Sequence, residues 1–325
     1  MFERLGESPL GPALLGMTYF AAAVLALLVT QGVNGIAAIW PPSGIVLATL
    51  LVVPRRTVWR FTLAAIVASL AANLLTGSGL RLGLGFTAAN GLEALVATLL
   101  LRRRSGRPVS FLEPSSLSVF FVASVIAAFV STGVAALVAP DPSGAFVLSW
   151  FITVLLGMLL ITPLILATFE ISVAARRPLS RREGLKLIGV GLLTIIATGA
   201  TFYQSHYPML FVPMMVVVVS VLFSGMLGGI VSVILVVIVG SLAIWFGTGP
   251  IALIRASQES RLLFFQFYLF ALFVSALPMA TLLAAHDRLR ADLSERIRLL
   301  DQAEAAAHIG HWRVNPAEEA IFWSP

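Results

Sequence analysis

The stretch AAIWPPSGIVLATLLVVPRR, residues 37–56, is apolar enough to enter a bilayer, but a tryptophan, two prolines, a serine and a glycine interrupt its start. Only 11 residues separate Pro42 from Pro54. At ~1.5 Å per residue they form under ~20 Å of helix, whereas the hydrocarbon core of a bilayer is ~30 Å thick. Prolines fit the first turn of a helix, so we expect a short helix to begin at Pro41 and Pro42 and to run to Pro54.

The preceding residues, NGIAAIW at 34–40, then have to cover the remaining depth as extended or loosely coiled backbone. Irregular backbone at membrane depth is tolerated only where protein or a water-filled cavity surrounds it. The break therefore predicts a pocket, opened from outside, beside Trp40, Pro41, Pro42 and Ser43.

The composition is that of an integral membrane protein. Of 325 residues, 59% are hydrophobic and 11% are charged, against about 25% charged in a soluble domain. The absence of cysteine excludes disulfides and thiolate chemistry, and the four histidines form no convincing metal cluster. No phosphate-binding glycine loop and no nucleophile paired with a base are present, so neither a cofactor nor catalysis by this chain is expected.

Apolar runs between helix breakers predict about ten transmembrane helices. The uncharged run Met209–Phe246 is too long for one crossing, and SGMLGG near its middle supplies a turn that makes two. The expected spans are 12–30, 36–53, 58–76, 84–101, 115–138, 147–169, 185–204, 208–224, 226–246 and 262–285.

This layout places 18 of the 21 lysines and arginines on one side, with Arg81, Arg255 and Arg261 on the other. The positive-inside rule then puts both termini in the cytoplasm. Membrane topology explains the net charge of +6 better than a nucleic-acid partner does, because the basic residues lie in short clusters between apolar runs.

Four polar residues of three consecutive spans are expected near mid-membrane: Ser43, Asn73, Asn90 and Glu93. Counted at ~1.5 Å per residue from the cytoplasmic ends, they lie about 13–20 Å deep. Glu93 is the one carboxylate well inside a predicted span, and no lysine or arginine at its depth can pair with it, so a protonated carboxyl is expected. Two interpretations stay open: Glu93 faces a functional cavity, or it bonds Asn90 or Asn73 as part of the packing.

Other features have simpler explanations. Trp59, Trp150 and Trp245 fall near span ends, where interfacial anchoring is expected. Small residues at 220, 224, 228 and 232 repeat every fourth position, which is typical of close helix packing.

Residues 286–307 change character and predict an amphipathic helix leaving the last span. Its apolar stripe consists of Leu289, Leu293, Ile297 and Leu300. The stripe is expected to be a parallel dimer interface, with packing onto its own chain as the alternative. Residues 308–325 predict two strands of a soluble domain that the chain only begins.

Several stretches, in order, resemble the first type of membrane-associated sensor domain, the MASE family of bacterial signalling proteins. They are IWPPSGIVLATLL, PRRTVWR, AANLLTG and AANGLEALVATLLLRR, followed by Gly157 with TPL at 162–164, Pro213, FGTGP at 246–250 and FFQFYLFAL at 264–272. The acidic residue that the family often has before Gly157 and the basic one before Gly225 are replaced here by aliphatic or aromatic neighbours such as Val154 and Phe223. The final stretch, AEAAAHIGHW…FWSP, resembles the opening of a PAS domain.

The resemblance implies a sensory input module of the bacterial inner membrane, with residues 1–285 as sensor, 286–307 as linker and 308–325 as the start of a PAS domain. Its output would be cyclic-di-GMP turnover or a histidine kinase, and its partners would be the bilayer, a second copy of the chain, and an unknown small ligand or membrane protein. A secondary transporter is the main alternative, since broken helices with a mid-membrane carboxylate are also typical of transporters. A scaffold that docks another membrane protein through the small residues of the ninth span is a third.

Overall fold

Eight helices are long and apolar enough to cross a membrane in the part of the chain that the computed structural model describes, which is residue 8 and residues 10–29, 37–104, 114–175, 180–307, 312–315 and 320–323. They are α2 (Leu10–Val29), α4 (Val58–Leu75), α5 (Gly79–Arg104), α6 (Pro114–Val138), α7 (Gly144–Ala175), α8 (Arg181–Tyr203), α9 (Phe211–Trp245) and α10 (Gln258–Ala307). The short helix α3 (Pro41–Val52) and the 3-10 turns η2 (Arg55–Thr57) and η3 (Pro250–Leu253) complete the helical part. The predicted polytopic all-α membrane fold is therefore present, whereas the predicted count of about ten spans with a short second one is not confirmed.

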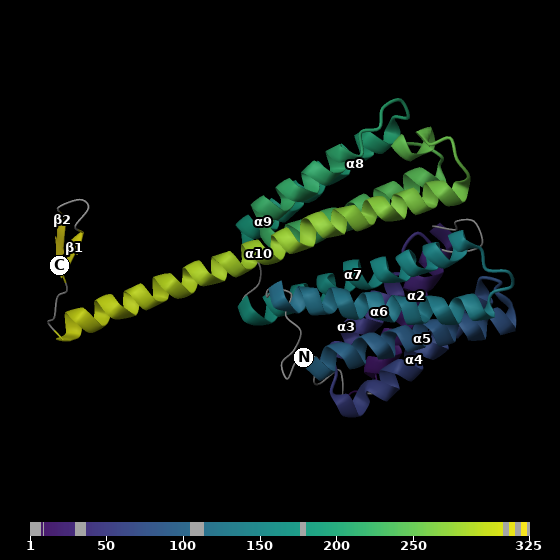
Figure 1. Cartoon of the computed structure of the whole chain (residues 1–325), viewed down its shortest axis with the longest axis horizontal. Helices are drawn as coiled ribbons and strands as arrows, with labels where there is room; N and C mark the ends of the chain where they lie inside the picture. The colour runs from purple at the N-terminus through teal and green to yellow at the C-terminus, as the bar shows by residue number, and fades with distance from the viewer. Residues whose placement is uncertain are drawn as a thin grey trace.

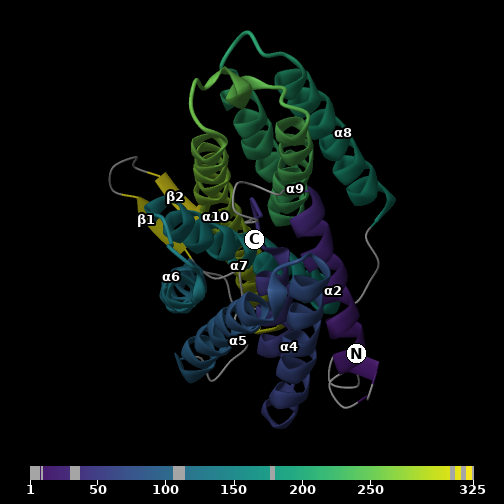
Figure 2. The same ribbon diagram turned by 90° about the vertical axis from the view of Figure 1, so that its right-hand side faces the viewer.

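The helices form two groups. Helices α8 and α9 and the first half of α10 make one group, α2, α4, α5 and α6 make the other, and α3 and α7 lie between them (Figure 1, Figure 2). Large apolar side chains such as Val67, Phe129 and Ile196 are well exposed on the outside of these groups. A bilayer is the solvent that such surfaces require, so the chain is a multi-pass membrane protein.

The short helix α3 begins where the two prolines predicted. Pro41 occupies its first turn, and the helix ends after 12 residues, with Val53 already in extended conformation. Leu47 and Ala48 belong to the larger hydrophobic core, which α3 shares with α7 and α10, whereas Val46 and Leu50 belong to the smaller core with α2 and α4. No residue of α3 is exposed. It is a buried element packed on several sides by longer helices.

Two glycines allow α3 to approach α7 closely. A Cβ atom added at Gly157 would lie 1.9 Å from the carbonyl oxygen of Trp40, and one added at Gly44 would lie 2.4 Å from the carbonyl oxygen of Gly157. Both distances are shorter than any non-bonded contact. The hydroxyl of Thr162 also donates to the carbonyl of Gly44 at 3.3 Å.

An arginine from α5 caps the other end of α3. The guanidinium of Arg102 donates to the carbonyl oxygens of Leu50 and Val53, and Arg55 donates to the carbonyl of Arg102. A cation is favourable at a helix carboxyl end because the unpaired carbonyls carry partial negative charge. Arg102 therefore has a structural contact in addition to its part in the charge pattern of the chain.

Helix α9 is a pair of antiparallel arms joined at Gly225. That glycine has φ 61° and ψ −150°, which is not helical. Beyond it, Gly228 lies against the backbone of Ser220. The amide of Gly249, just after α9, donates to the hydroxyl of Ser205, just before it, at 3.0 Å. Both ends of α9 therefore lie at the same side, as the turn predicted in SGMLGG requires.

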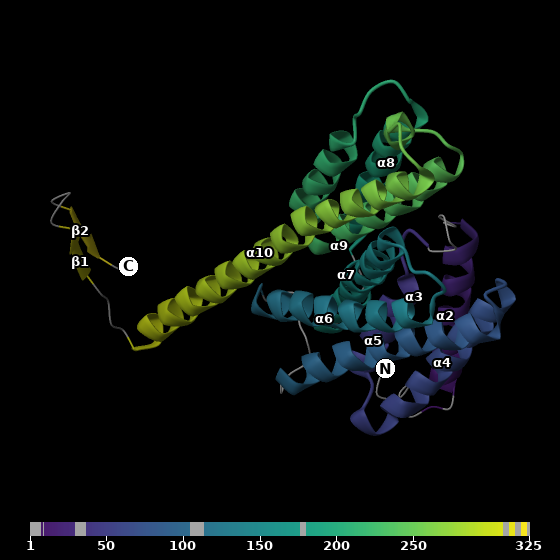
Figure 3. The same ribbon diagram turned by 45° about the vertical axis from the view of Figure 1, so that its right-hand side comes forward.

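Helix α10 is one continuous helix of 50 residues. Its side chains are buried in the bundle as far as Thr281, and beyond Ala285 almost all are exposed. Figure 3 shows this second half running clear of the other helices. Strands β1 (Trp312–Asn315) and β2 (Ala320–Trp323) follow and pair antiparallel, with Trp312 opposite Trp323, so the predicted strand pair is confirmed.

Candidate functional site

The non-helical segment 37–40, just before α3, is held by hydrogen bonds to the backbone and side chains of α7 and α10. The amide of Trp40 donates to the carbonyl of Thr153 at 3.2 Å, and the Thr153 hydroxyl donates to the carbonyl of Ala37 at 2.8 Å. The Gln266 amide donates to Thr153 Oγ1 at 2.7 Å and to the carbonyl of Ala38 at 3.3 Å. Irregular backbone inside a membrane needs such partners. Gln266 is fully buried, so α10 is bonded directly to this segment.

A cavity of about 580 Å³ lies beside this segment. Three of the predicted site residues line it: Trp40, Asn73 and Asn90. Its rim includes Thr76–Ser78 and 139–143, the connections between α4 and α5 and between α6 and α7, together with Glu259 in the first turn of α10. The cavity therefore opens at the end of the bundle where α10 begins, opposite to its exposed half.

The deeper wall of this cavity is aromatic. Phe86 lies 4.7 Å from Trp150 between ring centroids, and Phe146 lies 5.8 Å from Trp150. The Trp150 indole N–H donates to the hydroxyl of Ser131 at 3.1 Å. The expectation that Trp150 is an interfacial anchor is therefore wrong, because the side chain faces inward and is bonded to α6.

A second, much smaller cavity of about 20 Å³ lies among α2, α3, α4 and α5. It is lined by Tyr19, Ser43, Ser69, Thr87 and Asn90, among others. Its volume suits about one water molecule. Asn90 borders both cavities and so connects the predicted residues Ser43 and Asn73, which border one each.

Ser69 organises the hydrogen bonds of this polar cluster. Its hydroxyl accepts from Asn90 Nδ2 at 3.3 Å and from the Thr87 hydroxyl at 3.4 Å. Its carbonyl accepts from Asn73 Nδ2 at 3.0 Å. Asn73 lies in the last turn of α4, so it is nearer the mouth of the large cavity than the mid-membrane depth predicted for it.

Several buried polar atoms of the cluster have no hydrogen-bond partner among the described residues. They are Tyr19 Oη, Trp40 Nε1, Ser43 Oγ, Asn90 Oδ1 and both carboxyl oxygens of Glu93. Buried polar groups are nearly always paired, so a concentration of unpaired ones is typical of a site that holds water or a ligand.

Glu93 is almost completely buried, at 1% exposure. The hydroxyls of Ser43 and Ser131 are near enough to interact with its carboxyl, but neither makes a hydrogen bond of ordinary geometry to it. Glu93 lines neither cavity, and it bonds neither Asn90 nor Asn73. The packing role that the sequence left open for it is therefore not carried by those two asparagines.

The other two predicted site residues, Pro41 and Pro42, belong to the first turn of α3. Pro41 and Pro42 start the helix and line neither cavity. Sequence reasoning missed Tyr19, Trp150 and Gln266. Tyr19 and Gln266 could have been predicted, because each is a polar side chain within a long apolar run, and an isolated polar group inside a membrane span needs a hydrogen-bond partner.

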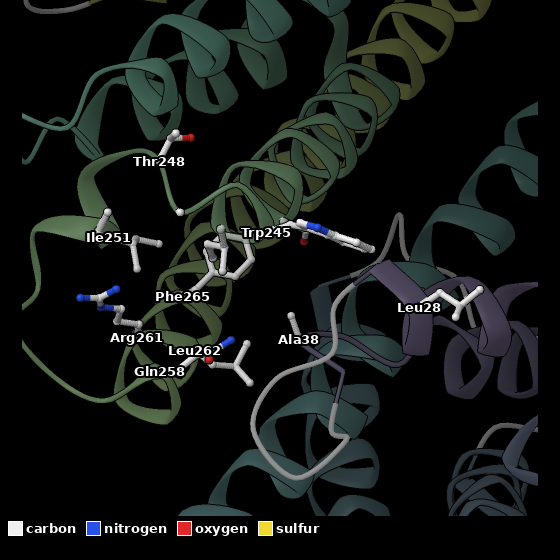
Figure 4. A pocket seen from close by; sticks show the side chains of 13 residues that line it. Leu28, Ala38, Trp245, Thr248, Ile251, Gln258, Arg261, Leu262 and Phe265 are labelled. Atoms are coloured by element: carbon white, nitrogen blue, oxygen red, sulfur yellow. The ribbon is translucent and has the colours of Figure 1, made fainter. Parts of the chain in front are cut away.

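A second large cavity, of about 530 Å³, lies between α2, α9, η3 and α10. Trp245 and Phe265 both line it, and Figure 4 shows them near the middle of the view, with Ala38 below them and Arg261 on the side away from Leu28. The Arg261 Nε–H donates to the carbonyl of Ile254 at 3.0 Å. This cavity and the aromatic-walled one lie on either side of the segment 37–40, since Ala38 lines one and Ala37 and Trp40 line the other.

The described residues contain no group of three or more histidine, cysteine, aspartate or glutamate side chains that could hold a metal ion. His308 and His311 lie outside the described residues.

The comparison with protein families decides which kind of membrane protein this is. The family model of MASE1 matches residues 10–286, which is nearly all of the helical part. The chain belongs to the MASE1 family. MASE1 is a membrane sensory input domain of signalling proteins and is not catalytic. No curated protein and no solved structure matches the chain. The region matched by the MASE1 model ends at residue 286, where the exposed half of α10 begins.

Proposed function

We propose that this MASE1 domain detects a signal at the aromatic-walled cavity and passes it through α10 to a cytoplasmic output domain. The observation that carries the proposal is the bonding of Gln266: the helix that leaves the membrane is the same helix that holds the segment 37–40 beside the cavity. A change in the position of Trp40 would therefore act directly on α10.

We further propose that both termini are cytoplasmic and that the chain crosses the inner membrane ten times. The two arms of α9 and the short helix α3 support this count, with α3 and its preceding segment together spanning once. The loops at 76–79, 139–143 and 246–257 then face outside, and the large cavity opens there.

The output is proposed to begin with a PAS domain whose first two strands are β1 and β2, followed by cyclic-di-GMP turnover or a histidine kinase. The strand pair after a long exposed helix supports this arrangement. A two-stranded hairpin is only marginally stable alone, so a larger sheet is expected to include it.

Homodimerisation is proposed to occur through the linker. Leu289, Leu293, Ile297 and Leu300 are between 50% and 69% exposed, so the described part of the chain leaves this stripe uncovered. The alternative in which the linker helix packs onto its own chain is therefore not supported. Two copies in parallel would bury the stripe as a coiled coil does.

Single cysteines test the dimer. Cysteines at residues 289, 293, 297 and 300 are expected to crosslink between chains several times faster than a cysteine at Arg298, because Arg298 lies on the charged face, where it bonds Glu295. A cysteine at Arg290 is expected to give an intermediate yield, since Arg290 lies one heptad before Ile297 at the edge of the stripe. The measurement is disulfide yield in membrane vesicles. Equal yields at all positions would show a solvated helix without a partner.

A secondary transporter is the second candidate, favoured by the short buried helix and by Glu93. It predicts solute flux that survives removal of residues 286–325. The scaffold alternative has less support, because Ser220, Gly228 and Ser232 are buried within the chain, where Ser232 accepts from Thr194.

A further inference from the structure

The 530 Å³ cavity between α2, α9, η3 and α10 has Arg261 as the one charged side chain among its described lining residues. The Arg261 Nε–H donates to the carbonyl of Ile254, and no carboxylate of the described residues pairs with the guanidinium. The terminal nitrogens of this guanidinium therefore remain to bond a ligand. They present their N–H groups as a planar fork that matches a phosphate or carboxylate group.

The acidic residues at this end of the bundle do not neutralise Arg261. Asp141 and Glu259 line the aromatic-walled cavity and are not among the described lining residues of this one. Glu259 also has an interaction of its own. Arg255, in the connection before α10, adds a second positive charge near the same helix end. The charge of this cavity therefore favours an anion.

The rest of the lining is mostly apolar and aromatic. Trp245 and Phe265 lie near the middle of the view in Figure 4. Ile251 lies on the same side of that view as Arg261, and Leu28 lies on the opposite side. Burial against such surfaces stabilises an alkyl chain, whereas a small inorganic anion gains nothing from them. The combination suits an amphiphile with an anionic head and an alkyl chain.

The lining residues come from helix ends, so the cavity lies near one surface of the membrane region. Leu28 is the last residue but one of α2, Trp245 is the last residue of α9, and Arg261 lies in the first turns of α10. Lipid headgroups lie at this level of a bilayer, with their acyl chains directly beneath. Leu28 and Trp245 are 54% and 58% exposed, so a lipid can reach the cavity from the bilayer.

We propose that this cavity binds one anionic phospholipid, with its phosphate at Arg261 and part of an acyl chain along Phe265 and Trp245. The volume is in the range of small-molecule sites, so the cavity accommodates the headgroup and one chain segment while the rest of the lipid stays in the bilayer. The site goes beyond the proposed function, because it shares no described lining residue with the aromatic-walled cavity and needs neither a signal nor an output domain.

The position of the lipid is close to the helix that leaves the membrane. Ala38 lines this cavity, and its carbonyl accepts from the Gln266 amide. Phe265, the neighbour of Gln266 on α10, also lines it. A bound lipid would therefore contact the segment 37–40 on the side opposite to the aromatic-walled cavity.

Quenching of Trp245 fluorescence by lipids with brominated acyl chains tests the site. The chain is placed in phosphatidylcholine nanodiscs that contain a small fraction of brominated phosphatidylglycerol or brominated phosphatidylcholine. The Trp245 signal is the difference between the original chain and Trp245→Phe, which is expected to fold because Trp245 is exposed. We expect phosphatidylglycerol to quench this signal at an about tenfold lower mole fraction, because its net charge is negative. Equal quenching by the two lipids would overturn the proposal.

Variants show whether Arg261 holds the headgroup. Arg261→Gln is expected to abolish the preference for phosphatidylglycerol, and Arg261→Lys to retain part of it, because lysine keeps the charge but not the planar fork. Arg255→Gln is the matched control and should keep the preference, since Arg255 is exposed and does not line the cavity. A preference that is undiminished in both Arg261 variants, or lost equally in the control, would contradict this site. If Arg261→Gln does not fold, the lysine variant and the comparison of lipids in the original chain still decide.

Competition separates a lipid from a free anion. Dodecyl phosphate carries both parts of the proposed ligand and is expected to relieve the quenching, whereas inorganic phosphate at the same concentration should not. Equal relief by both would show a site for the phosphate group alone, and the lipid would be wrong. These outcomes are independent of signal detection at the aromatic-walled cavity, which crosslinking in the linker tests.

Discussion

At the scale of single residues, Glu93 is the carboxylic acid of the buried polar cluster, and neither of its carboxyl oxygens makes a hydrogen bond of ordinary geometry. Asn73 and Asn90 each bond Ser69, so their amides stabilise the contact between α4 and α5. An unsatisfied buried polar group costs stability. An unpaired Glu93 carboxyl in the core therefore indicates that this residue has a role other than packing.

Glu93→Leu tests that role. Since the substitution removes an unpaired polar group, the free energy of unfolding is expected to stay the same or to rise by up to about 1 kcal/mol. The unfolding temperature should therefore be equal to that of the original chain or higher. The measurement is thermal unfolding in detergent followed by intrinsic fluorescence. Glu93→Gln is the control that keeps the shape. A clear loss of stability in the leucine variant would instead assign Glu93 a structural hydrogen bond.

At the scale of elements, α3 depends on its contacts with the longer helices. Its own length and apolar sequence give it little independent stability, because isolated helices of about 12 residues are marginal in water and a short one cannot span a bilayer. Its position is set by Gly44 and Gly157 on the α7 side and by Arg102 at its end.

Gly157→Ala is expected to disrupt this packing, since the new methyl group would overlap the Trp40 carbonyl. A loss of about 1–3 kcal/mol is expected from overpacking. Gly133→Ala is the matched control, because nothing lies within 4 Å of a Cβ at Gly133. Comparison of the two thermal midpoints decides the matter, and equal midpoints would show that α7 can move away from α3 at little cost.

Gln266→Leu is expected to separate α10 from the segment 37–40. It removes the hydrogen bond from Gln266 to the Ala38 carbonyl and costs about 1 kcal/mol, typical of an interhelical hydrogen bond in a membrane. It should also change the crosslinking yield at residue 293. Gln258→Leu, at the exposed start of α10, is the control for the chemistry of the substitution. If the crosslinking yield at residue 293 is unchanged in Gln266→Leu, the proposed coupling between the segment 37–40 and the linker is wrong.

At the scale of the whole molecule, the two helix groups meet along α3 and α7, and both large cavities lie near that junction. The segment 37–40 borders both. A ligand in one cavity could therefore alter the other through a few residues of irregular backbone, without deformation of the long helices.

Reporter fusions test the membrane topology. Fusions at residues 180 and 290 are expected to report cytoplasm, and those at 78, 142 and 253 the outside, because most basic residues then lie inside. Paired alkaline phosphatase and fluorescent-protein activities give the readout. A cytoplasmic signal at residue 142 would contradict the ten-span arrangement.

Local sequence patterns predicted the elements well and the contacts between them poorly. The start of α3 follows from Pro41 and Pro42, and the reversal within α9 follows from the length of the uncharged run and from Gly225. Gln266 and Thr153 are 113 positions apart, and nothing local states that they meet. Trp150 was assigned to the interface because a span end is the usual place for tryptophan, whereas a cavity wall is decided by the neighbouring helices.

The continuity of α10 gives the linker a rotational phase. With about 3.6 residues per turn, each residue inserted after the bundle turns everything beyond it by about 100°. Seven added residues restore the original facing to within about 20°, whereas two rotate it by about 200°. A chimaera that joins this domain to a foreign output enzyme should therefore keep the number of helical residues between Gln266 and the output domain unchanged, or change it in steps of seven.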